Sequence, residues 1–362
     1  MNGKRTYVIA EAGVNHNGSL RIAKKMVAAA AEAGVDAIKF QTFVAESVIA
    51  RHAAKANYQI KTTGKAESQL EMVKKLELDR KSHLVLLRHC RELGIQFLST
   101  AFDQDSMKFL LEEIKMPTIK ISSGEITNGP LLLTAARYKL PIILSTGMST
   151  LHDIREALGV IAFGCVSRLN IKPSLSLFRN AFKSKYGQRL LKRRVSLMHC
   201  VTEYPAAYEA MNLRALDTLS HEFRLPIGLS DHSLGICIPM AAVAMGAEIV
   251  EKHFTLDRAM QGPDHRASLE PDELTAMVRG IRAVESALGS GQKKPTRTEL
   301  VNKLLVRKSL VARKAIKRGA LFSHENLTAK RPGRGISPMR YWEYLGRKAT
   351  RHYQADDFIA HG

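Results

Sequence analysis

The sequence is poor in the features that mark membrane proteins, disulfide scaffolds and zinc-binding modules. No uninterrupted apolar stretch reaches the ~18–20 residues that a membrane-spanning helix needs. The four cysteines lie far apart and form no CxxC pair, at Cys90, Cys165, Cys200 and Cys237. This spacing indicates neither a zinc knuckle nor a disulfide framework. Acidic residues are also scarce, since 34 Asp and Glu stand against 55 Lys and Arg, for a formal net charge of +21.

The start of the chain does not resemble a secretory signal. Lys4 and Arg5 supply positive charge, but Glu11, Asn15 and His16 arrive too soon for an apolar core to form. We therefore expect no signal peptide, no membrane partner and a cytoplasmic location.

What the sequence does contain is typical of a folded, globular protein. Of its 362 residues, 45% are hydrophobic and 25% are charged, which excludes whole-chain disorder. The length allows one large domain or two ordinary ones, with room for a sizeable core.

The positive charge is concentrated in two segments. Residues 164–194 hold nine basic residues and no acidic one, and residues 291–362 hold seventeen basic and five acidic residues. The rest of the chain is balanced, with 29 of each sign. Such segments form either a solvated or assembly-related face, which we favour, or a surface that attracts polyanions. Because neither segment matches a known nucleic-acid module, we expect no nucleic-acid partner.

Short β-branched runs alternate with amphipathic helical patterns through the first 290 residues. Strands are predicted at 7–10, 37–40, 95–99, 118–122, 141–145, 196–200, 226–229 and 248–253. Helices are predicted after them, at about 19–33, 81–93, 103–115, 129–138, 150–162, 212–222, 235–246 and 271–288. Eight such repeats predict a closed (β/α)8 barrel. A doubly wound sheet is the alternative, but no GxGxxG motif opens a helix.

The domain organisation follows from where this alternation is interrupted. We predict a catalytic barrel over 1–288 that carries the basic insertion 164–194. The long polar excursion 44–80 after the second strand is too long for an ordinary loop and is interpreted as a lid. A Gly/Lys/Pro linker over 289–300 leads to a small, mostly β domain over 301–362, with short strands and tight Gly/Pro turns.

Polar residues follow every predicted strand, at the end where barrel enzymes hold their active sites. Lys39 and Lys120, with the hydroxyls of Thr100, Ser123 and Ser230, suit an anionic, phosphate-bearing ligand. A single such lysine is more often a side chain that reaches solvent, but two at strand ends favour a binding role.

Two further groups of strand-end residues suggest metal and acid–base chemistry. His232 and His253 end adjacent strands and could share a divalent cation, such as Mn, Fe, Co, Zn or Mg, although from spacing alone a structural role is equally plausible. Glu11 and Glu125 are candidates for binding hydroxyls or moving protons.

The strand-end residues belong to motifs that resemble those of sialic acid synthases. In chain order the motifs are IAEAGVNHNG (9–18), IKFQTF (38–43), KISSGE (120–125), ILSTGM (143–148), HCVTEYPA (199–206), GLSDHSLG (228–235), EKHFTLD (251–257) and GPDHRASLEPDEL (262–274). That family joins a (β/α)8 barrel to a C-terminal antifreeze-like (SAF) domain, to which RKSLVA (307–312), NLTAKRPGRGISP (326–338) and YQADDFI (353–359) are similar.

The resemblance implies an enzyme that condenses phosphoenolpyruvate with the open-chain aldehyde of an acetamido sugar. C3 of phosphoenolpyruvate attacks the aldehyde, water adds at C2, and phosphate leaves by C–O cleavage. With N-acetylmannosamine, the substrate that we expect first, the product is N-acetylneuraminate. The nearest alternative is the same reaction on a diacetamido-trideoxy hexose, which gives legionaminate or another nonulosonate. A remote alternative is a basic nucleic-acid-binding or scaffold protein.

The resemblance also implies roles for individual residues. Glu11, Glu125 and Asp264 are the expected catalytic carboxyl groups, and His232 and His253 the ligands of Mn2+, with Mg2+ or Co2+ as alternatives. The expected substrate-binding residues are Lys39, Gln41, Thr100, Lys120, Ser123, Ser145, Thr202, Tyr204, Ser230 and Arg331. Arg331 would reach the active site of a second subunit, which implies a domain-swapped homodimer. Ala101 and Thr202 depart from the family pattern, which usually has proline and, in some members, asparagine there.

Overall fold

The computed structural model describes residues 5–167 and 171–361. The chain forms two compact units, Met1–Gly289 and Ser290–Gly362, and each is described by itself.

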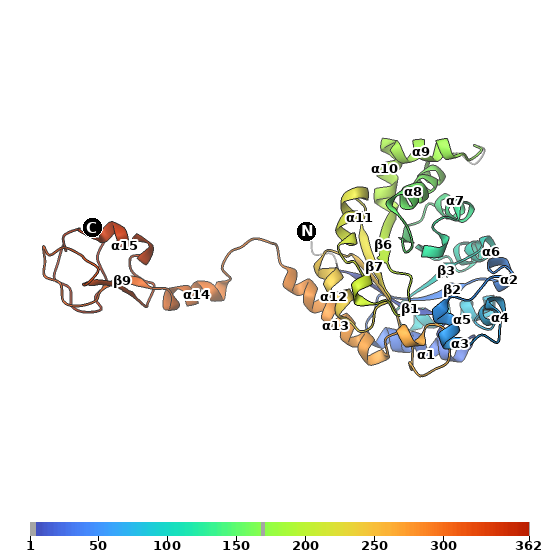
Figure 1. The fold of residues 1–362 in the computed structure, drawn as a ribbon, viewed down its shortest axis with the longest axis horizontal. Helices are drawn as coiled ribbons and strands as arrows, with labels where there is room; N and C mark the ends of the chain where they lie inside the picture. Colours follow the sequence, from blue (N-terminus) through green and yellow to red (C-terminus); the bar gives the residue numbers. More distant parts are fainter. Residues whose placement is uncertain (1–4, 168–170, 362) are drawn as a thin grey trace. The chain divides into compact units, whose positions relative to one another are not determined.

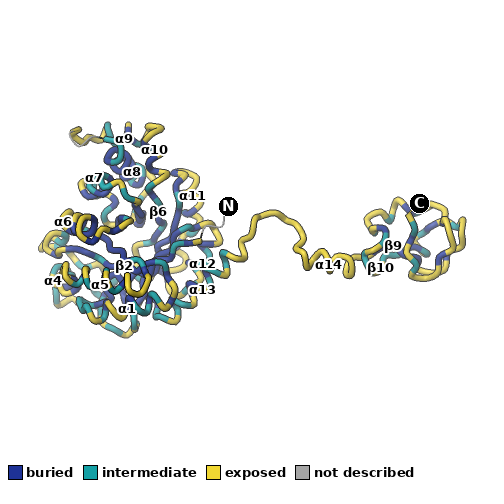
Figure 2. The backbone as a smooth tube through the Cα atoms, turned by 180° about the vertical axis from the view of Figure 1, so that it is seen from behind, coloured by how far each residue is buried: buried dark blue, intermediate teal, exposed yellow. Residues whose placement is uncertain are grey.

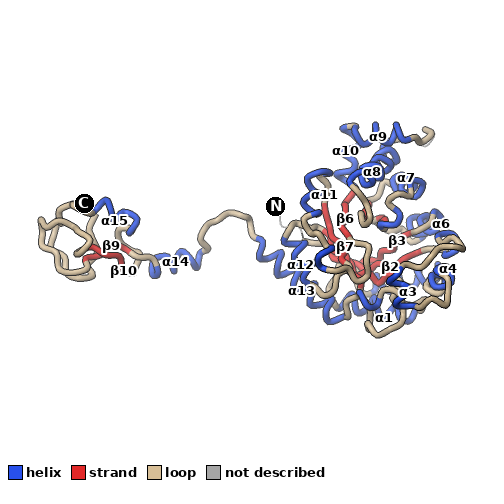
Figure 3. The backbone as a smooth tube through the Cα atoms, in the orientation of Figure 1, coloured by secondary structure: helices blue, strands red, loops and turns tan. Residues whose placement is uncertain are grey.

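The first unit is a closed barrel of eight parallel strands in sequential order, which confirms the predicted (β/α)8 fold (Figure 1). The strands are β1 Tyr7–Gly13, β2 Ala37–Thr42, β3 Gln96–Ala101, β4 Ile119–Ile121, β5 Ile142–Ser145, β6 Val195–Cys200, β7 Ile227–Asp231 and β8 Ile249–His253. Helices surround the strands (Figure 3). They are α1 Leu20–Glu32, α5 Arg80–Glu92, α6 Gln104–Lys108, α7 Gly129–Arg137, α8 Leu151–Val166, α11 Ala215–Phe223, α12 Cys237–Ala244 and α13 Pro271–Leu288. Among the described residues, no helix is long and apolar enough to cross a bilayer.

The interior of the barrel is built in layers because side chains of a strand alternate between its two faces. An apolar layer fills the barrel with Ile9, Ala37, Leu98, Ile143, Met198 and Ile249. Two residues further along the same strands come Glu11, Lys39, Thr100, Ser145, Cys200 and Glu251. The strand alternation therefore places a polar layer directly on the apolar one, at the carboxyl ends of the strands.

Two segments embellish the barrel. The excursion 44–80 contains three short helices, α2 Ala45–Val48, α3 Asn57–Thr63 and α4 Gln69–Lys74. The basic insertion contains α9 Leu175–Lys183 and α10 Lys185–Arg194, while residues 168–170 lie outside the described residues. Helix α9 packs on α8 so closely that a Cβ on Gly159 would lie 3.1 Å from the carbonyl oxygen of Phe178. The insertion exposes much of its surface (Figure 2).

The second unit begins with α14, Arg297–Val306, so residues 297–300 of the expected linker are helical. The cause is a capping box between Thr296 and Glu299. Strands β9 (Ser309–Ala312) and β10 (Leu327–Lys330) pair antiparallel, and helix α15 spans Tyr341–Tyr344. Its apolar core consists of Leu310, Ala312, Ile316, Phe322, Leu327, Ile336, Tyr344, Ala349, Tyr353 and Ile359.

Candidate active site

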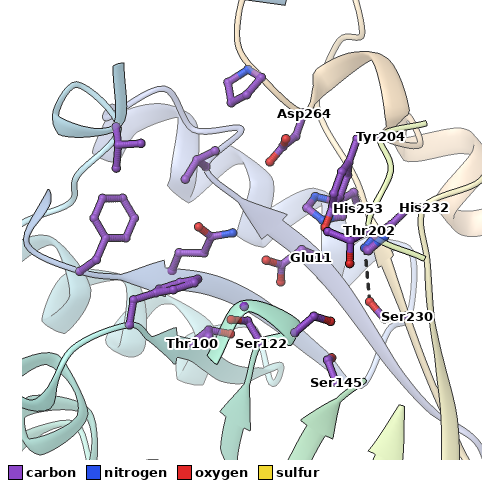
Figure 4. A pocket seen from close by; sticks show the side chains of 18 of the residues that line it. Glu11, Thr100, Ser122, Ser145, Thr202, Tyr204, Ser230, His232, His253 and Asp264 are labelled. Carbon is purple, nitrogen blue, oxygen red and sulfur yellow. Dashed lines mark hydrogen bonds between the residues drawn. The ribbon is translucent and has the colours of Figure 1, made fainter. Parts of the chain in front are cut away.

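A cavity of about 310 Å3 opens at the carboxyl ends of the barrel strands (Figure 4). Its lining includes most of the residues that the sequence nominated. These are Glu11, Lys39, Gln41, Thr100, Lys120, Ser123, Ser145, Thr202, Tyr204, Ser230, His232, His253 and Asp264. Side chains from all sides of the barrel thus meet in one cavity, although their roles stay predictions.

The floor of the cavity is a cluster of buried charges. Lys39 Nζ lies 2.5 Å from Glu11 Oε2 and 3.6 Å from Glu251 Oε2. Lys120 Nζ lies 3.2 Å from Glu251 Oε1. Glu251 thus stands between the two lysines, and two cations and two carboxyl groups share a space nearly closed to water.

The pKa shifts within this cluster follow from burial and from the neighbouring charges. Burial raises the pKa of Glu11 above its ordinary value, so this carboxyl group can hold a proton near neutral pH. Burial alone would also raise the pKa of Glu251, but Lys120 and Lys39 outweigh burial and lower it. Burial and the charge of Lys39 lower the pKa of Lys120. An arriving anion would relieve this mutual repulsion of the lysines and bind favourably.

Hydroxyl groups surround the two lysines. Lys39 Nζ donates to Thr100 Oγ1 over 3.1 Å, and Ser230 Oγ donates to Glu251 Oε1 over 2.9 Å. Ser123 Oγ accepts from the backbone N–H of Gly147 over 3.0 Å. Ser145 Oγ is buried and has no hydrogen-bond partner among residues 5–167 and 171–361. Because buried polar groups are rarely left unpaired, the Ser145 hydroxyl suits a bound ligand oxygen.

His232 and His253 lie together at the ends of β7 and β8, with ring centroids 5.5 Å apart. The Nδ1 of His232 bonds the carbonyl oxygen of Val201 over 2.5 Å, which leaves Nε2 beside Ser230 Oγ, 3.5 Å away. The Nδ1 of His253 is buried and has no hydrogen-bond partner in the part of the chain that the structure describes. Burial lowers the pKa of both rings, so both are neutral at pH 7. Neutral imidazoles with free nitrogens are what a divalent metal requires, and the pair therefore fits one.

No group of three or more His, Cys, Asp or Glu in the described part of the chain could hold a metal by itself. A cation bound here would complete its coordination with water or substrate oxygens, as open catalytic sites do.

Aromatic rings and a carboxyl group form the side of the cavity above the histidines. The ring of Tyr204 lies 4.2 Å from that of His232 and 5.6 Å from that of His253, centroid to centroid. Tyr58, from α3, lies 5.1 Å from Tyr204. Burial raises the pKa of Asp264 to about 6, so this carboxyl group changes charge near physiological pH.

Two nominated residues do not line the cavity. The carboxylate of Glu125 accepts a hydrogen bond from Asn128 Nδ2 over 2.7 Å, and Glu125 is absent from the described lining of the cavity. Arg331 is exposed in the second unit. Of the two departures from the family pattern, Thr202 lines the cavity, and Ala101 continues β3 in register with Thr42 of β2.

The sequence analysis missed several functional candidates. It left open whether Glu251 orients a neighbour or reacts and assigned it no role in the site, although Glu251 stands two residues before His253 on one strand and so shares its face. It also did not nominate Tyr58, because the polar excursion around it carried no strand pattern. Lys252 and Asp231, which flank the inward-facing residues, instead pair with each other over 2.5 Å and are fully buried.

The comparisons with known proteins agree with this geometry. Residues 26–293 match the NeuB family, and residues 307–360 match the SAF domain. The chain is 49% identical to the N,N'-diacetyllegionaminic acid synthase of Campylobacter jejuni over 356 residues, which covers 98% of this chain and 99% of that protein. It is 33% identical to the pseudaminic acid synthase of the same organism, over 99% of this chain and 96% of that protein.

The chain is also similar to a protein of known structure. The crystal structure of N-acetylneuraminic acid (sialic acid) synthetase from Leptospira borgpetersenii serovar Hardjo-bovis has a TM-score of 0.65 with this chain and is 34% identical to it. The match covers 83% of this chain and 90% of that one.

Proposed function

Because the chain belongs to the NeuB family, we propose that it condenses phosphoenolpyruvate with the open-chain form of a diacetamido-trideoxy hexose. The products are a legionaminate-type nonulosonate and inorganic phosphate. The observation that carries this proposal is the pair of buried lysines, Lys39 and Lys120, on the floor of the same cavity as the two histidines.

The sugar is the point at which the sequence-based expectation changes. N-acetylmannosamine was expected first, and the diacetamido sugar was its alternative. Similarity now favours the alternative, since the relative at 49% identity is named an N,N'-diacetyllegionaminic acid synthase, whereas the N-acetylneuraminic acid synthetase of known structure is 34% identical. N-acetylmannosamine stays the second candidate because the match to the N-acetylneuraminic acid synthetase spans most of both chains.

Phosphoenolpyruvate would bind on the cationic floor. Its phosphate and carboxylate groups need several donors, and Lys39, Lys120 and the free hydroxyl of Ser145 supply them. Thr100, Ser123, Ser230 and Thr202 add hydroxyls around the same space. Glu251 pairs with both lysines and so holds them in place before the anion arrives.

The aldehyde carbon would lie between C3 of phosphoenolpyruvate and the histidine pair. His232 and His253 would hold a divalent cation, Mn2+ first, with Mg2+ or Co2+ as alternatives. When bound, the metal supplies Lewis-acid polarisation of the aldehyde oxygen. C3 forms the new C–C bond to the aldehyde carbon, water adds at C2, and the C2–O bond breaks as phosphate leaves.

The carboxyl groups have different proposed roles because they lie at different places in the cavity. Glu11 contacts Lys39 beside the expected C2, and its raised pKa suits it to hold or return the proton of the attacking water. Asp264, with Gln41 and Tyr204, would bind the sugar at the mouth of the cavity. The role of Glu125 toward sugar hydroxyls stays a prediction, since Glu125 accepts from Asn128 and is absent from the described lining of the cavity.

A homodimer completes the proposal. Helix α14 exposes Leu300, Val301, Leu304, Leu305 and Val306, and Met339 and Trp342 in the same unit are 82% and 72% exposed. Apolar surface of this extent favours coverage by another chain, and a second copy would bring its Arg331 to the acetamido group.

The assay that tests the proposed function measures phosphate release from phosphoenolpyruvate with each sugar in the presence of Mn2+. We expect turnover with the diacetamido-trideoxy hexose and a lower kcat/KM with N-acetylmannosamine. Chelation should abolish turnover, and added Mn2+ should restore it in the wild type but not in His232→Ala or His253→Ala. Phosphate release with neither sugar contradicts the proposed reaction, and full activity of both histidine variants contradicts the metal site.

A further inference from the structure

The excursion between β2 and α5, residues 44–80 and hereafter the lid, forms one wall of the cavity. Seven of its residues line the cavity: Val48, Ile49, Tyr58, Gln59, Met72, Val73 and Leu76. None of these carries a charge, and five are wholly apolar. The wall therefore differs in character from the lysines, carboxyl groups and histidines that line the rest of the cavity.

The lid is a packed structure with its own small core. Val14, Phe43 and Leu76 form an apolar cluster against which Val48, Val73 and Phe102 pack. At the base of the lid, the backbone N–H of Ala45 donates to Glu77 Oε1 over 2.6 Å. Three of the side chains that hold the lid to the barrel, Val48, Val73 and Leu76, thus also line the cavity.

The lid also spans the opening of the cavity. It leaves the barrel at β2, on the side of Lys39, yet Tyr58 reaches Tyr204 beyond β6. Tyr204 in turn lies against His232. A sugar whose aldehyde end lies at the histidines therefore has the lid along the rest of its length.

This wall offers very few hydrogen-bond partners. Its polar side-chain groups are the hydroxyl of Tyr58 and the amide of Gln59, and the Oε1 of Gln59 already accepts from the backbone N–H of Ala56 over 2.9 Å. A hydroxyl group buried against the five apolar side chains loses its bonds to water and gains none from them in return. A methyl group in the same position gains from leaving water.

We propose that the lid makes the enzyme select sugars that place methyl groups against this wall, at the deoxy carbon and at the ends of the acetamido groups, over sugars that place hydroxyls there. In this inference, which rests on the proposed function, the deoxy methyl group and the acetamido methyl groups of the substrate lie against Val48, Ile49 and Met72. The lid determines the specificity, while the strand-end residues perform a reaction common to both sugars. An apolar pocket rejects an added hydroxyl only moderately, by up to about 100-fold.

The test replaces lid side chains by polar ones of similar size. Val48→Thr and Met72→Gln keep the volume of the wall and add hydrogen-bonding groups. The matched control is Val44→Thr, because Val44 lies on the same segment, is 46% exposed and does not line the cavity. For each protein, kcat/KM is measured by phosphate release with the diacetamido-trideoxy hexose and with N-acetylmannosamine at saturating phosphoenolpyruvate.

We expect wild type and Val44→Thr to prefer the diacetamido sugar equally. In Val48→Thr and Met72→Gln the preference should fall about 5- to 10-fold, mainly because N-acetylmannosamine improves in KM. A structural defect would lower both sugars together and leave the ratio unchanged. An unchanged ratio in both folded variants overturns the role of the lid.

The same data separate the two proposals. If wild type releases phosphate with neither sugar, the proposed function fails. If wild type releases phosphate but the ratio of kcat/KM for the two sugars does not change in the lid variants, the reaction stands and the inference about the lid fails. The same holds if the wild-type ratio already favours N-acetylmannosamine.

Discussion

The barrel and the C-terminal unit place their charges in opposite ways. Seven charged residues are buried in the described part of the barrel, namely Glu11, Lys39, Lys120, Asp231, Glu251, Lys252 and Asp264. Among the described residues of the C-terminal unit, the one buried polar residue is Ser309. That unit has an apolar core and carries its excess of basic residues outside.

The difference shows where net charge is informative. Isolated buried charges cost several kcal/mol each unless paired, so a fold retains them where they serve a site. Exposed charges cost little and carry little structural information. The formal charge of +21 thus describes surfaces, whereas the chemistry depends on a barrel interior in which the signs nearly balance.

The largest expected difference between the two units comes from removing one paired lysine from each of them. Lys252→Met leaves Asp231 buried without its partner and should lower the free energy of unfolding by about 3–5 kcal/mol. Lys330→Met removes an exposed partner of Asp356 and should change stability by less than about 1 kcal/mol.

Urea unfolding followed by circular dichroism measures the first variant, and amide exchange of β9 and β10 measures the second. Equal losses of stability in the two variants would show that burial of an ion pair does not determine the energetic cost of removing its lysine.

A smaller effect is expected from Arg331, the exposed residue of the C-terminal unit to which substrate binding is assigned. Lys120→Met should lower kcat/KM about 100- to 1,000-fold by removing a cation from the site. Arg331→Ala should lower it about 10- to 100-fold through a lost charge-assisted hydrogen bond. Arg334→Ala, an exposed neighbour, should have no effect.

Mixing the two inactive chains tests whether the site is shared between subunits. In a heterodimer, the intact barrel of the Arg331→Ala chain receives Arg331 from the Lys120→Met chain, so about half of its sites should regain activity. Heterodimers without activity would show that Arg331 acts in the active site of its own subunit or has no role in the site.

Acid should remove the stability that buried neutral histidines contribute to the barrel, partly offset by Glu11 and Asp264, whose raised pKa values act with the opposite sign. Burial, with His83 and His265 nearby, lowers the pKa of His16 to about 4, and burial lowers that of His265 to about 4 despite Asp257. Unfolding restores a pKa near 6.5, so the unfolded state binds more protons between these values. Stability present above pH 6.5 is therefore lost as the pH falls toward 4, by about 1 kcal/mol for each histidine at pH 5.5.

Hydrogen exchange at pH 7.5 and 5.5 compares the two units in one sample. Protection in β1 and α1 should fall at the lower pH, while β9 and β10 should be unchanged. The variant His16→Asn should reduce the pH dependence, and the same dependence in both units would contradict its assignment to buried histidines.

Much of the barrel could be predicted because its strands are short β-branched runs and its helices are amphipathic. Some features could not. The 103–115 helical pattern becomes α6 followed by a π-helical segment, Phe109–Glu113, and apolar spacing does not distinguish these hydrogen-bond patterns. The helices of the lid escaped prediction because they are short and mostly polar.

The meeting of strand-end residues in one cavity could also be predicted in part, because it follows from the strand pattern. Alternation along β1, β2 and β8 carries Glu11, Lys39 and His253 inward once the strands are known. Alternation could not reveal that Lys252 pairs with Asp231 or that the ring of Tyr58 contacts that of Tyr204, because these are contacts between different segments of the chain. It also could not reveal the hydrogen bond from Asn128 to Glu125, which follows from the local loop conformation after β4.

The central claim is that the buried lysines hold phosphoenolpyruvate for condensation with loss of phosphate by C–O cleavage. Phosphoenolpyruvate labelled with 18O at the bridging oxygen tests it directly, in a reaction with the diacetamido-trideoxy hexose and Mn2+ followed by 31P NMR. We predict that all of the label appears in inorganic phosphate. Label retained in the sugar acid, or no phosphate released by an enzyme that binds Mn2+ and phosphoenolpyruvate, would contradict the account.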